Sequence, residues 1–254
     1  MRLFNIDKIP SPLKDTYNDQ RKWCDMNWQE ALKKHYKDLN KLLEKVTLFD
    51  VWSNELRGDK VIKSLIPEIF MDAFISLHIA CMGLYKYANS CLRSELETAL
   101  RLVYFSTHPV EFEWWCNGNE WYKGRDVWGE GYVYFEQLKT VKDFDKKLPS
   151  GEKLFARVRK IYGILSQYVH SSKSVLQTSL KFSPKYNTQS FKNWCSNFKE
   201  IQQYSNIIIV LGFSEEFKKM RKDHQEKIIK IGLIDRNYKK SLKDIFGLKF
   251  RGRL

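Results

Sequence analysis

Four side chains in residues 152–172 have the types and the spacing to transfer protons beside a fixed positive charge. At about 100° per residue on a helix, Arg159, Tyr162, Ser166 and His170 share one narrow polar stripe. The stripe joins a guanidinium and two hydroxyls to the one side chain that titrates near neutral pH. The pattern predicts a helix over residues 152–172 and makes its polar stripe the first candidate site. The opposite, wide face is apolar and comprises Leu154, Val158, Ile161, Ile164, Leu165, Tyr168 and Val169.

A second polar ridge lies on the long helix predicted for residues 84–105. Arg93, Glu97, Arg101 and Tyr104 recur on one side of it, opposite an apolar face. One interpretation is an ion ladder within the helix, worth a few tenths of a kcal/mol per pair. In the other, Arg93 and Glu97 pack against the first stripe and complete a site there.

Charge is unevenly distributed over the 254 residues. The chain carries 44 Lys and Arg against 30 Asp and Glu, a net charge of +14, with much of the excess in residues 218–253. The electrostatic field of this positive charge favours binding to polyanions such as RNA, DNA or acidic membranes. The alternative interpretation is that the charge serves solubility alone. We expect nucleic-acid contacts from Arg159, Lys218, Lys219, Arg221, Lys222, Arg251 and Arg253.

The five cysteines are odd in number and widely spaced, without a C-x-x-C pair. This usage predicts neither disulfides nor a zinc site and is typical of a reducing, cytoplasmic environment. The acidic pairs Glu111/Glu113 and Asp143/Asp145 are too local to form a metal site, and no phosphate-binding glycine loop occurs. We therefore expect no metal and no cofactor.

The most apolar stretch, residues 66–84, is interrupted by Glu68, Asp72, Ser76 and His78. It is too polar to predict a membrane span, and residues 1–14 lack the apolar core of a signal peptide. We expect a protein without membrane contact.

Periodicity predicts an all-α, multi-helix bundle. Residues 1–24, with Pro10 and Pro12, suggest an irregular arm, and helices are expected from residue 25 toward 56 and over 62–81, 84–105, 135–148, 152–172 and 190–211. Residues 175–182 suggest an extended piece. The bundle would span residues 25–212, and residues 213–254 would form a basic helical C-terminal extension with helices near 214–231 and 236–246.

An aromatic insertion interrupts the bundle at residues 110–135. Its many Trp, Tyr and Phe side chains alternate with four glycines. Three interpretations stay open: a lid, a platform on which bases stack, or a satellite core under a long insertion. In a fourth interpretation the segment is a small-molecule sensor, which would need a pocket walled by Trp114, Trp115, Trp121 and Trp128.

Two stretches together resemble a known group of proteins. Residues 75–105 contain G-x-Y-x-x-A, then R-S-x-L-E and a closing Y-F, and residues 162–170 read Y-x-x-L-S-x-x-V-H. This pair is similar to uncharacterised bacterial helical families related to the HEPN superfamily, which includes abortive-infection and toxin ribonucleases. The resemblance implies an all-α bundle, often a homodimer, and metal-free RNA cleavage in active members.

The resemblance also assigns roles. The family signature is an Arg, a polar residue and then a His on one helix; His170 and Ser166 match it, but Leu165 stands where the Arg is expected. In metal-free cleavage a base takes the 2′-OH proton and a cation stabilises the phosphorane. His170 would serve as acid and base and Arg93 or Arg101 as cation. Ser166, Glu97 and Tyr162 would complete the site.

We thus carry two functional hypotheses into the structure. The first is an RNA-targeting, HEPN-like effector of a bacterial antiviral defence or toxin system that uses His170 as a metal-independent endoribonuclease. The second is a catalytically degenerate helical module that binds nucleic acid or a partner protein in such a system. A nuclease requires His170 in an open, positively lined groove, whereas a binding module depends on basic surface alone.

Overall fold

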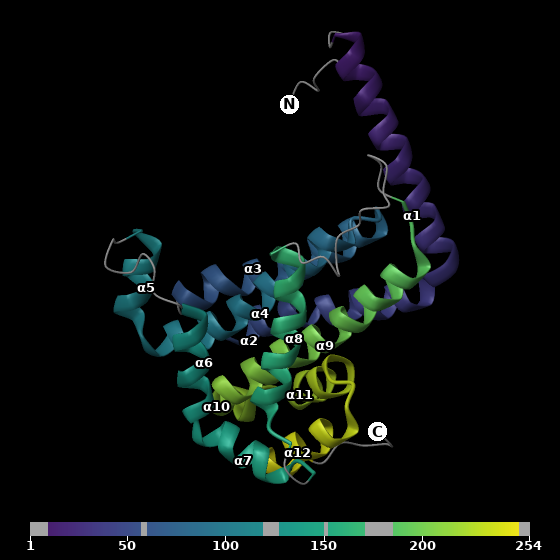
Figure 1. Cartoon of the computed structure of the whole chain (residues 1–254). Coiled ribbons are helices and arrows are strands. Elements are labelled where there is room, and N and C mark those ends of the chain that lie inside the picture. The colour runs from purple at the N-terminus through teal and green to yellow at the C-terminus, as the bar shows by residue number, and fades with distance from the viewer. Residues whose placement is uncertain (1–9, 57–59, 119–126, 150–151, 171–184, 249–254) are drawn as a thin grey trace.

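The computed structural model describes residues 10–56, 60–118, 127–149, 152–170 and 185–248, and all regular structure within them is helical. This confirms the predicted all-α class (Figure 1). The elements are α1 (Ser11–Val46), α2 (Leu48–Glu55), α3 (Lys60–Cys81), α4 (Tyr85–Thr107), α5 (Pro109–Cys116), α6 (Val127–Gln137), α7 (Lys139–Lys147), α8 (Leu154–Val169), α9 (Thr188–Gly212), α10 (Ser214–Lys219), α11 (Lys222–Lys227), a π-helix (Ile228–Gly232) and α12 (Arg236–Phe246).

The core forms where α3, α8 and α9 pack around α4. Residues 201–211 of α9 are buried on every side, which is typical of a helix enclosed by its neighbours rather than one at the surface. The end of α9 comes so close to α4 that a Cβ at Gly212 would overlap the Val103 side chain. At the α3–α4 junction, Gly83 adopts φ +84°, a left-handed conformation that separates the two helices.

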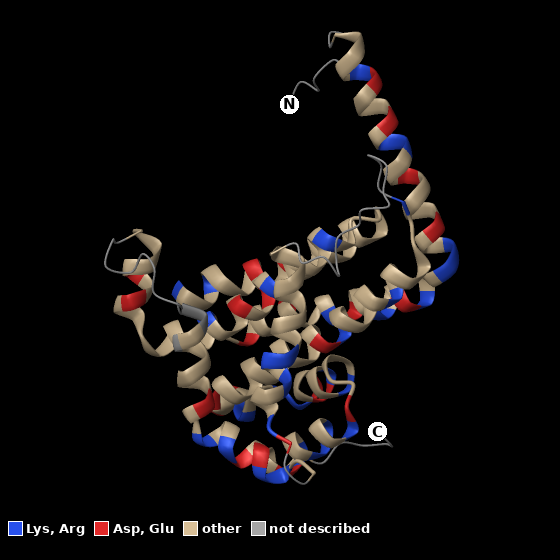
Figure 2. Ribbon diagram, in the orientation of Figure 1, with Lys and Arg blue, Asp and Glu red and all other residues tan. Residues whose placement is uncertain are grey.

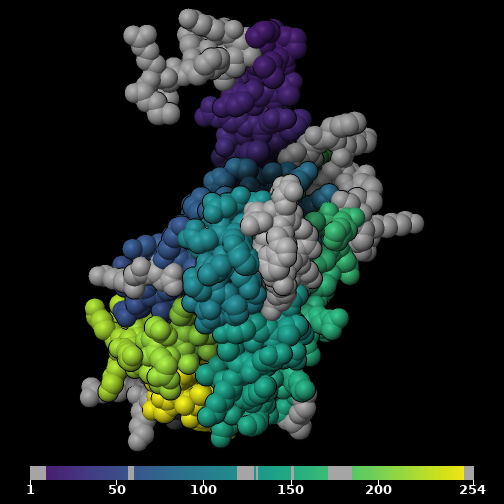
Figure 3. All heavy atoms as spheres, turned by 90° about the vertical axis from the view of Figure 1, so that its left-hand side faces the viewer, coloured from purple at the N-terminus to yellow at the C-terminus, as the bar shows by residue number. Residues whose placement is uncertain are grey.

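The prediction of an irregular arm over residues 1–24 is wrong for the part described. Helix α1 already begins at Ser11, with Pro12 in its first turn, where the missing N–H is no loss. Residues 1–9 lie outside the described part of the chain. The first buried residue of α1 is Asn27, so residues 11–26 form a helical arm that stands out from the body (Figures 1 and 3).

A kink at His35 turns α1 from the arm onto the body. The backbone there is non-helical (φ −136°, ψ 18°), and the ring stacks on Phe191 with centroids 4.5 Å apart. His35 Nε2 lies 2.8 Å from the Tyr186 hydroxyl. The kink therefore has a specific cause, the insertion of His35 between α1 and the start of α9.

Several predicted boundaries differ from the observed ones. The helix expected to run toward residue 56 breaks at Thr47, and the one expected over 135–148 breaks at Leu138, whose ψ of 134° is extended. Helix α3 begins at Lys60, two residues before the predicted start at residue 62, and contains Pro67 in its interior. The expected extended piece, residues 175–182, lies outside the described residues.

The C-terminal segment packs against the bundle. Phe217, Ile228 and Tyr238 are fully buried, and Phe217 contacts Trp52 of α2. Lys45, at the end of α1, donates hydrogen bonds to the carbonyls of Ile231 and Gly232, the last turn of the π-helix. Burial lowers the pKa of Lys45 to about 8.

The described part of the aromatic insertion contributes to the main core. Phe112 of α5 and Phe135 of α6 are buried, and Tyr132 packs edge-on against Phe155 of α8. This favours the core interpretation for α5 and α6. Trp121 lies outside the described residues, so the sensor pocket is not tested.

Helix α3 is apolar on most of its circumference. By length and composition it alone, among the described helices, could cross a membrane, with a mean hydropathy of 1.4 over its most apolar stretch. Of that stretch, 44% is buried in the body. The core helix of a soluble protein has the same composition, so this is weak evidence about the membrane.

Candidate functional site

Helices α4 and α8 are joined by a polar network that contains four of the predicted site residues. Arg93 donates to Glu97 Oε1 at 2.9 Å and to the Tyr162 hydroxyl at 2.7 Å, and that hydroxyl donates to Glu97 Oε1 at 3.0 Å. Arg101 binds the other oxygen of Glu97 at 3.3 Å. The Arg93 guanidinium also lies over the Tyr162 ring. The predicted ion ladder is thus present, and it is extended to a second helix.

The network is half-buried and contains two guanidinium groups and one carboxylate. The side chains of Arg93, Glu97 and Arg101 are 16–23% exposed, so the ion pairs are partly shielded from solvent. Burial and the neighbouring Glu97 raise the pKa of Tyr162, which keeps its hydroxyl protonated as a donor. Arg93, Glu97 and Tyr162 are bonded to one another, which suits the attachment of α8 to α4. Arg101 Nε is buried without a hydrogen-bond partner among the described residues.

A second acidic group borders the network from α3. Burial raises the pKa of Asp72 to about 6, against a hydrogen bond from Ser94 that lowers it. The charges of Glu68 and Glu97 raise it further and that of Arg101 lowers it. No sequence pattern identified Asp72 as a site residue, because its position depends on how α3 packs on α4.

His170 lies away from this network. It is the exposed C-cap of α8, and its backbone N–H donates to the Ser166 carbonyl at 3.0 Å. Eight residues separate it from Tyr162, about 12 Å along the helix axis. Within the described ranges, no hydrogen bond or ion pair joins the His170 ring to Arg93, Glu97 or Tyr162. Arg93 and Glu97 therefore pack beside the stripe two turns from His170.

The other two stripe residues are also accounted for. The Ser166 hydroxyl donates to the Tyr162 carbonyl of its own helix at 2.8 Å, so it does not orient His170. Arg159 is exposed and lies beside Tyr132 of α6. The packing of α8 therefore does not assemble one continuous site from Arg159, Tyr162, Ser166 and His170.

The predicted C-terminal cations are partly neutralised. Lys218 pairs with Glu215 and Arg221 with Asp223, both at 2.7 Å. Lys219 and Lys222 are exposed. Arg251 and Arg253 lie outside the described residues.

A stronger basic surface lies at the opposite end of α8, where α7 and α12 meet (Figure 2). Residues 139–160 carry eight Lys and Arg against three Asp and Glu, and residues 235–244 carry four against two. We call this surface the basic end. Of its cations, Lys146 pairs with Asp143 at 3.1 Å. The exposed cations of the basic end are Lys139, Lys142, Lys146, Lys147, Lys153, Arg159, Lys160, Arg236 and Lys240.

Packing fixes the basic end in place. Phe144 of α7 contacts Tyr238 of α12, and the Ser241 hydroxyl donates to the Lys147 carbonyl at 3.2 Å. Arg157 of α8 pairs with Glu152 and approaches Asp235 at 3.9 Å. A hollow of about 840 Å³ opens beside it, between α8, α9 and the start of α12. The sequence K-T-V-K-D-F-D-K-K of α7, with Val141 and Phe144 as its only buried residues, is the signal that could have located this surface.

Comparison with protein-family models, with curated proteins and with solved structures finds no match to this chain. Among the described residues, no group of three or more His, Cys, Asp and Glu side chains is placed to hold a metal ion.

Proposed function

We propose that this chain is a helical module that binds RNA through its basic end and serves as the recognition part of a bacterial defence or toxin system. The observation that carries the proposal is the gathering of exposed lysines and arginines from α7, α8 and α12 on one surface. Phosphate contacts by such side chains supply most of the affinity for nucleic acid without a specific sequence.

The resemblance to HEPN-related families supports the proposed role in a bacterial defence or toxin system. The two motif-bearing helices, α4 and α8, pack directly against each other through Arg93 and Tyr162, as one shared functional unit would require. The motif arginine is replaced by Leu165, which is fully buried and packs in the core. That replacement favours binding over cleavage, since no cation occupies the usual place beside His170.

Cleavage remains the second candidate, favoured by the exposure of His170 at the end of α8. A second chain would have to bring a cation to it. The binding module and the ribonuclease would both bind RNA, so one assay that measures binding and cleavage distinguishes them.

The test measures binding and cleavage of a mixed RNA pool in EDTA. We expect binding without cleavage, and a loss of affinity of about tenfold or more in Lys139→Ala/Lys142→Ala/Lys147→Ala. The control is Lys218→Ala/Arg221→Ala, whose cations are already paired, and it should bind almost as well as the wild type. Equal affinity in both variants would contradict the proposal. Cleavage by the wild type that disappears in His170→Ala would favour the ribonuclease.

A further inference from the structure

The hollow beside the basic end, between α8, α9 and the start of α12, is lined by equal numbers of positive and negative side chains. Its volume is about 840 Å³, within the range of pockets that hold small molecules. The charged residues that line it are Lys153, Arg157, Lys160, Glu152, Glu200 and Asp235. Basic charge alone therefore does not describe this hollow, although it opens on a basic surface.

The walls of the hollow are fixed by contacts within the protein. The buried Gln203 side chain of α9 accepts hydrogen bonds from the backbone N–H groups of Ile234 and Asp235 at 2.7 and 2.8 Å. Arg157 of α8 pairs with Glu152 and approaches Asp235 at 3.9 Å, which ties α8 to the start of α12. The hollow is therefore preformed, and a ligand loses little affinity to its reorganisation.

Glu200 of α9 differs from the other two carboxylates of the hollow. Glu152 and Asp235 both form ion pairs with Arg157, and Asp235 also accepts a hydrogen bond from the Asn237 N–H at 2.8 Å. The Glu200 side chain is half-buried, and among the described residues no hydrogen bond or ion pair engages its carboxylate. Because a carboxylate only accepts hydrogen bonds, a ligand at Glu200 must present N–H or O–H donors.

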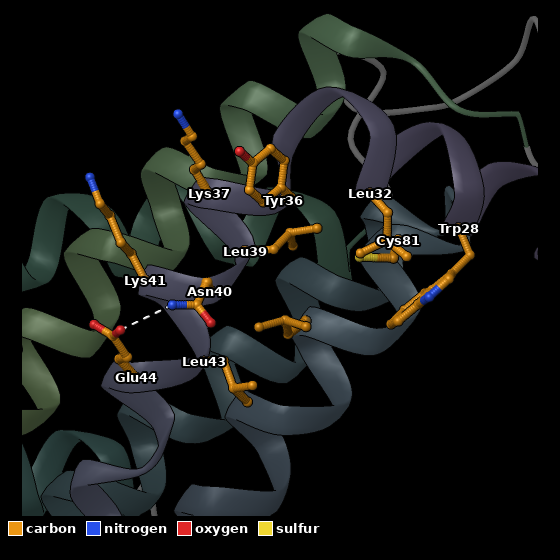
Figure 4. A pocket seen from close by; sticks show the side chains of 11 residues that line it. Trp28, Leu32, Tyr36, Lys37, Leu39, Asn40, Lys41, Leu43, Glu44 and Cys81 are labelled. Carbon is orange, nitrogen blue, oxygen red and sulfur yellow. Dashed lines mark hydrogen bonds between the residues drawn. The ribbon is translucent and has the colours of Figure 1, made fainter.

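A groove between α1 and α3 provides a comparison (Figure 4). Its volume is about 780 Å³, and its lining is mainly apolar, with side chains such as Leu32 and Leu77. The carboxylate at its rim, Glu44, already accepts a hydrogen bond from Asn40 at 3.0 Å. Of these two hollows, the one beside the basic end is therefore the one that leaves a carboxylate for a ligand.

The other charges of the hollow restrict the ligand that Glu200 can bind. Lys153, Arg157 and Lys160 repel a further ammonium or guanidinium group, and the three carboxylates repel a bare phosphate inside the hollow. A neutral group that carries N–H donors and is attached to an anion satisfies both conditions. A nucleotide has this composition, because its base can enter the hollow while its phosphate contacts the exposed Lys153 and Lys160.

Guanine is the base whose edge matches a carboxylate best. Its N1–H and N2–H₂ groups are adjacent donors, so the two oxygens of one carboxylate can accept from both. Uracil offers only its N3–H, and adenine and cytosine offer only an amino group on the same edge. The faces of a base are apolar, and the hollow provides apolar surface for them at Ile164 and Ile234, which are 37% and 46% exposed.

We propose that the hollow between α8, α9 and the start of α12 binds an unpaired guanine base of the bound RNA, and that Glu200 selects this base. Lys153 and Lys160 hold the adjoining phosphates. The site rests on the proposed function, since both lysines belong to the basic end, and it adds a base preference to a surface whose other contacts are with phosphates.

The test compares single-stranded oligouridines that differ only in the central base, with binding measured by fluorescence anisotropy. We expect the full chain to bind the oligonucleotide with a central guanine about tenfold more tightly than the one with uracil. Hypoxanthine at the same position lacks the 2-amino group and should give an intermediate affinity. Glu200→Gln should abolish the preference, because its amide has a single acceptor and sets an N–H donor against guanine. It should bind the all-uridine oligonucleotide at least as well as the wild type does.

The matched control is Glu44→Gln, which removes the same charge at the α1–α3 groove and should keep the guanine preference. Lys139→Ala/Lys142→Ala/Lys147→Ala should weaken the binding of every oligonucleotide and leave the preference unchanged, which separates the two proposals. Equal affinity for the four central bases, a preference for a base other than guanine, or an unchanged preference in Glu200→Gln would overturn the guanine site and leave RNA binding intact. A wild type that binds none of the oligonucleotides would overturn the proposed function and the guanine site together.

Discussion

At the scale of single residues, the most unusual group is Glu95. It is fully buried on α4, where its carboxyl accepts hydrogen bonds from Gln202 Nε2 at 2.8 and 2.9 Å and from the Ser205 hydroxyl at 2.9 Å. Burial is the main cause that raises the pKa of Glu95 well above its ordinary value, and the charge of Asp72 raises it further. A carboxyl in such a place is stable when it is neutral.

This makes the free energy of unfolding depend on pH. Because the pKa of Glu95 is higher in the folded chain than in the unfolded chain, its contribution is fully present below about pH 4 and is lost as the pH rises. At pH 8 we expect the free energy of unfolding of Glu95→Gln to exceed that of the wild type by about 1–3 kcal/mol, because the glutamine side chain has no acidic proton to lose. The difference should disappear toward pH 4, as measured by urea unfolding.

The control for this prediction is Ser205→Ala, which removes one hydrogen bond but leaves the carboxyl. It should be less stable than the wild type and keep a pH dependence of the same sign, because the carboxyl still titrates and loses a hydrogen bond that lowers its pKa. Asp72, whose pKa is also raised, acts with the same sign, and the difference between the two proteins includes the loss of its repulsion with Glu95. A wild type and a Glu95→Gln variant with parallel pH profiles would show that Glu95 does not titrate as described.

The residues of the predicted site illustrate how far sequence reasoning reaches. The spacing of Arg93, Glu97 and Arg101 gave the ladder correctly, because neighbours at i+4 on a helix meet whatever surrounds them. The partner of Arg93 is Tyr162 and not His170, because the axial position of α8 against α4 depends on long-range packing. The sequence pattern of α4 or of α8 alone does not specify the axial position of one helix relative to the other.

At the scale of elements, the contact of α9 with α4 depends on one small residue. Alanine in place of a helical glycine usually stabilises by up to about 1 kcal/mol. At Gly212 the added methyl would overlap Val103, so we expect Gly212→Ala to lower the free energy of unfolding by about 1–3 kcal/mol. Thermal or denaturant unfolding checks this.

The chain offers a matched control in the middle of α8. A Cβ at Gly163 would meet nothing within 4 Å, so Gly163→Ala should be neutral or stabilising. The double variant Val103→Ala/Gly212→Ala should be less destabilised than the sum of the single changes, since Val103→Ala removes the methyl groups that the new methyl at residue 212 would overlap. Additive effects would mean that the two side chains do not compete for the same space.

Element boundaries were the weaker part of the sequence interpretation. The start of α1 was missed because Pro10 and Pro12 look like breakers, although Pro12 is compatible with a first helical turn. The breaks at Thr47 and Leu138 were not predicted, because the apolar period continues across both positions. The central helices α3, α4 and α9 were found because each has a long, uninterrupted apolar period.

At the scale of the whole molecule, charge is organised by the packing of three helices. The basic end combines α7 and the first turns of α8 with α12, which lies far away from both in the sequence (Figure 2). We expect RNA affinity to fall steeply with salt, and the slope of log affinity against log salt to decrease by about 0.7 for each phosphate contact removed.

The corresponding measurement is a salt titration of binding to a single-stranded RNA. Lys139→Ala/Lys142→Ala/Lys147→Ala should reduce the slope by about 2, whereas Lys218→Ala/Arg221→Ala should leave it nearly unchanged. A slope that is the same in all three proteins would mean that RNA contacts a different surface.

By itself, the sequence determined the helical class, the central helices and the excess of positive charge, because helix period and composition are local properties of the chain. Only the tertiary structure decided which groups of different helices meet. It gathered the lysines of α7 with those of α12 and set Arg93 against Tyr162. The physical reason is that the buried apolar faces fix the rotation and offset of each helix, and the polar side chains follow.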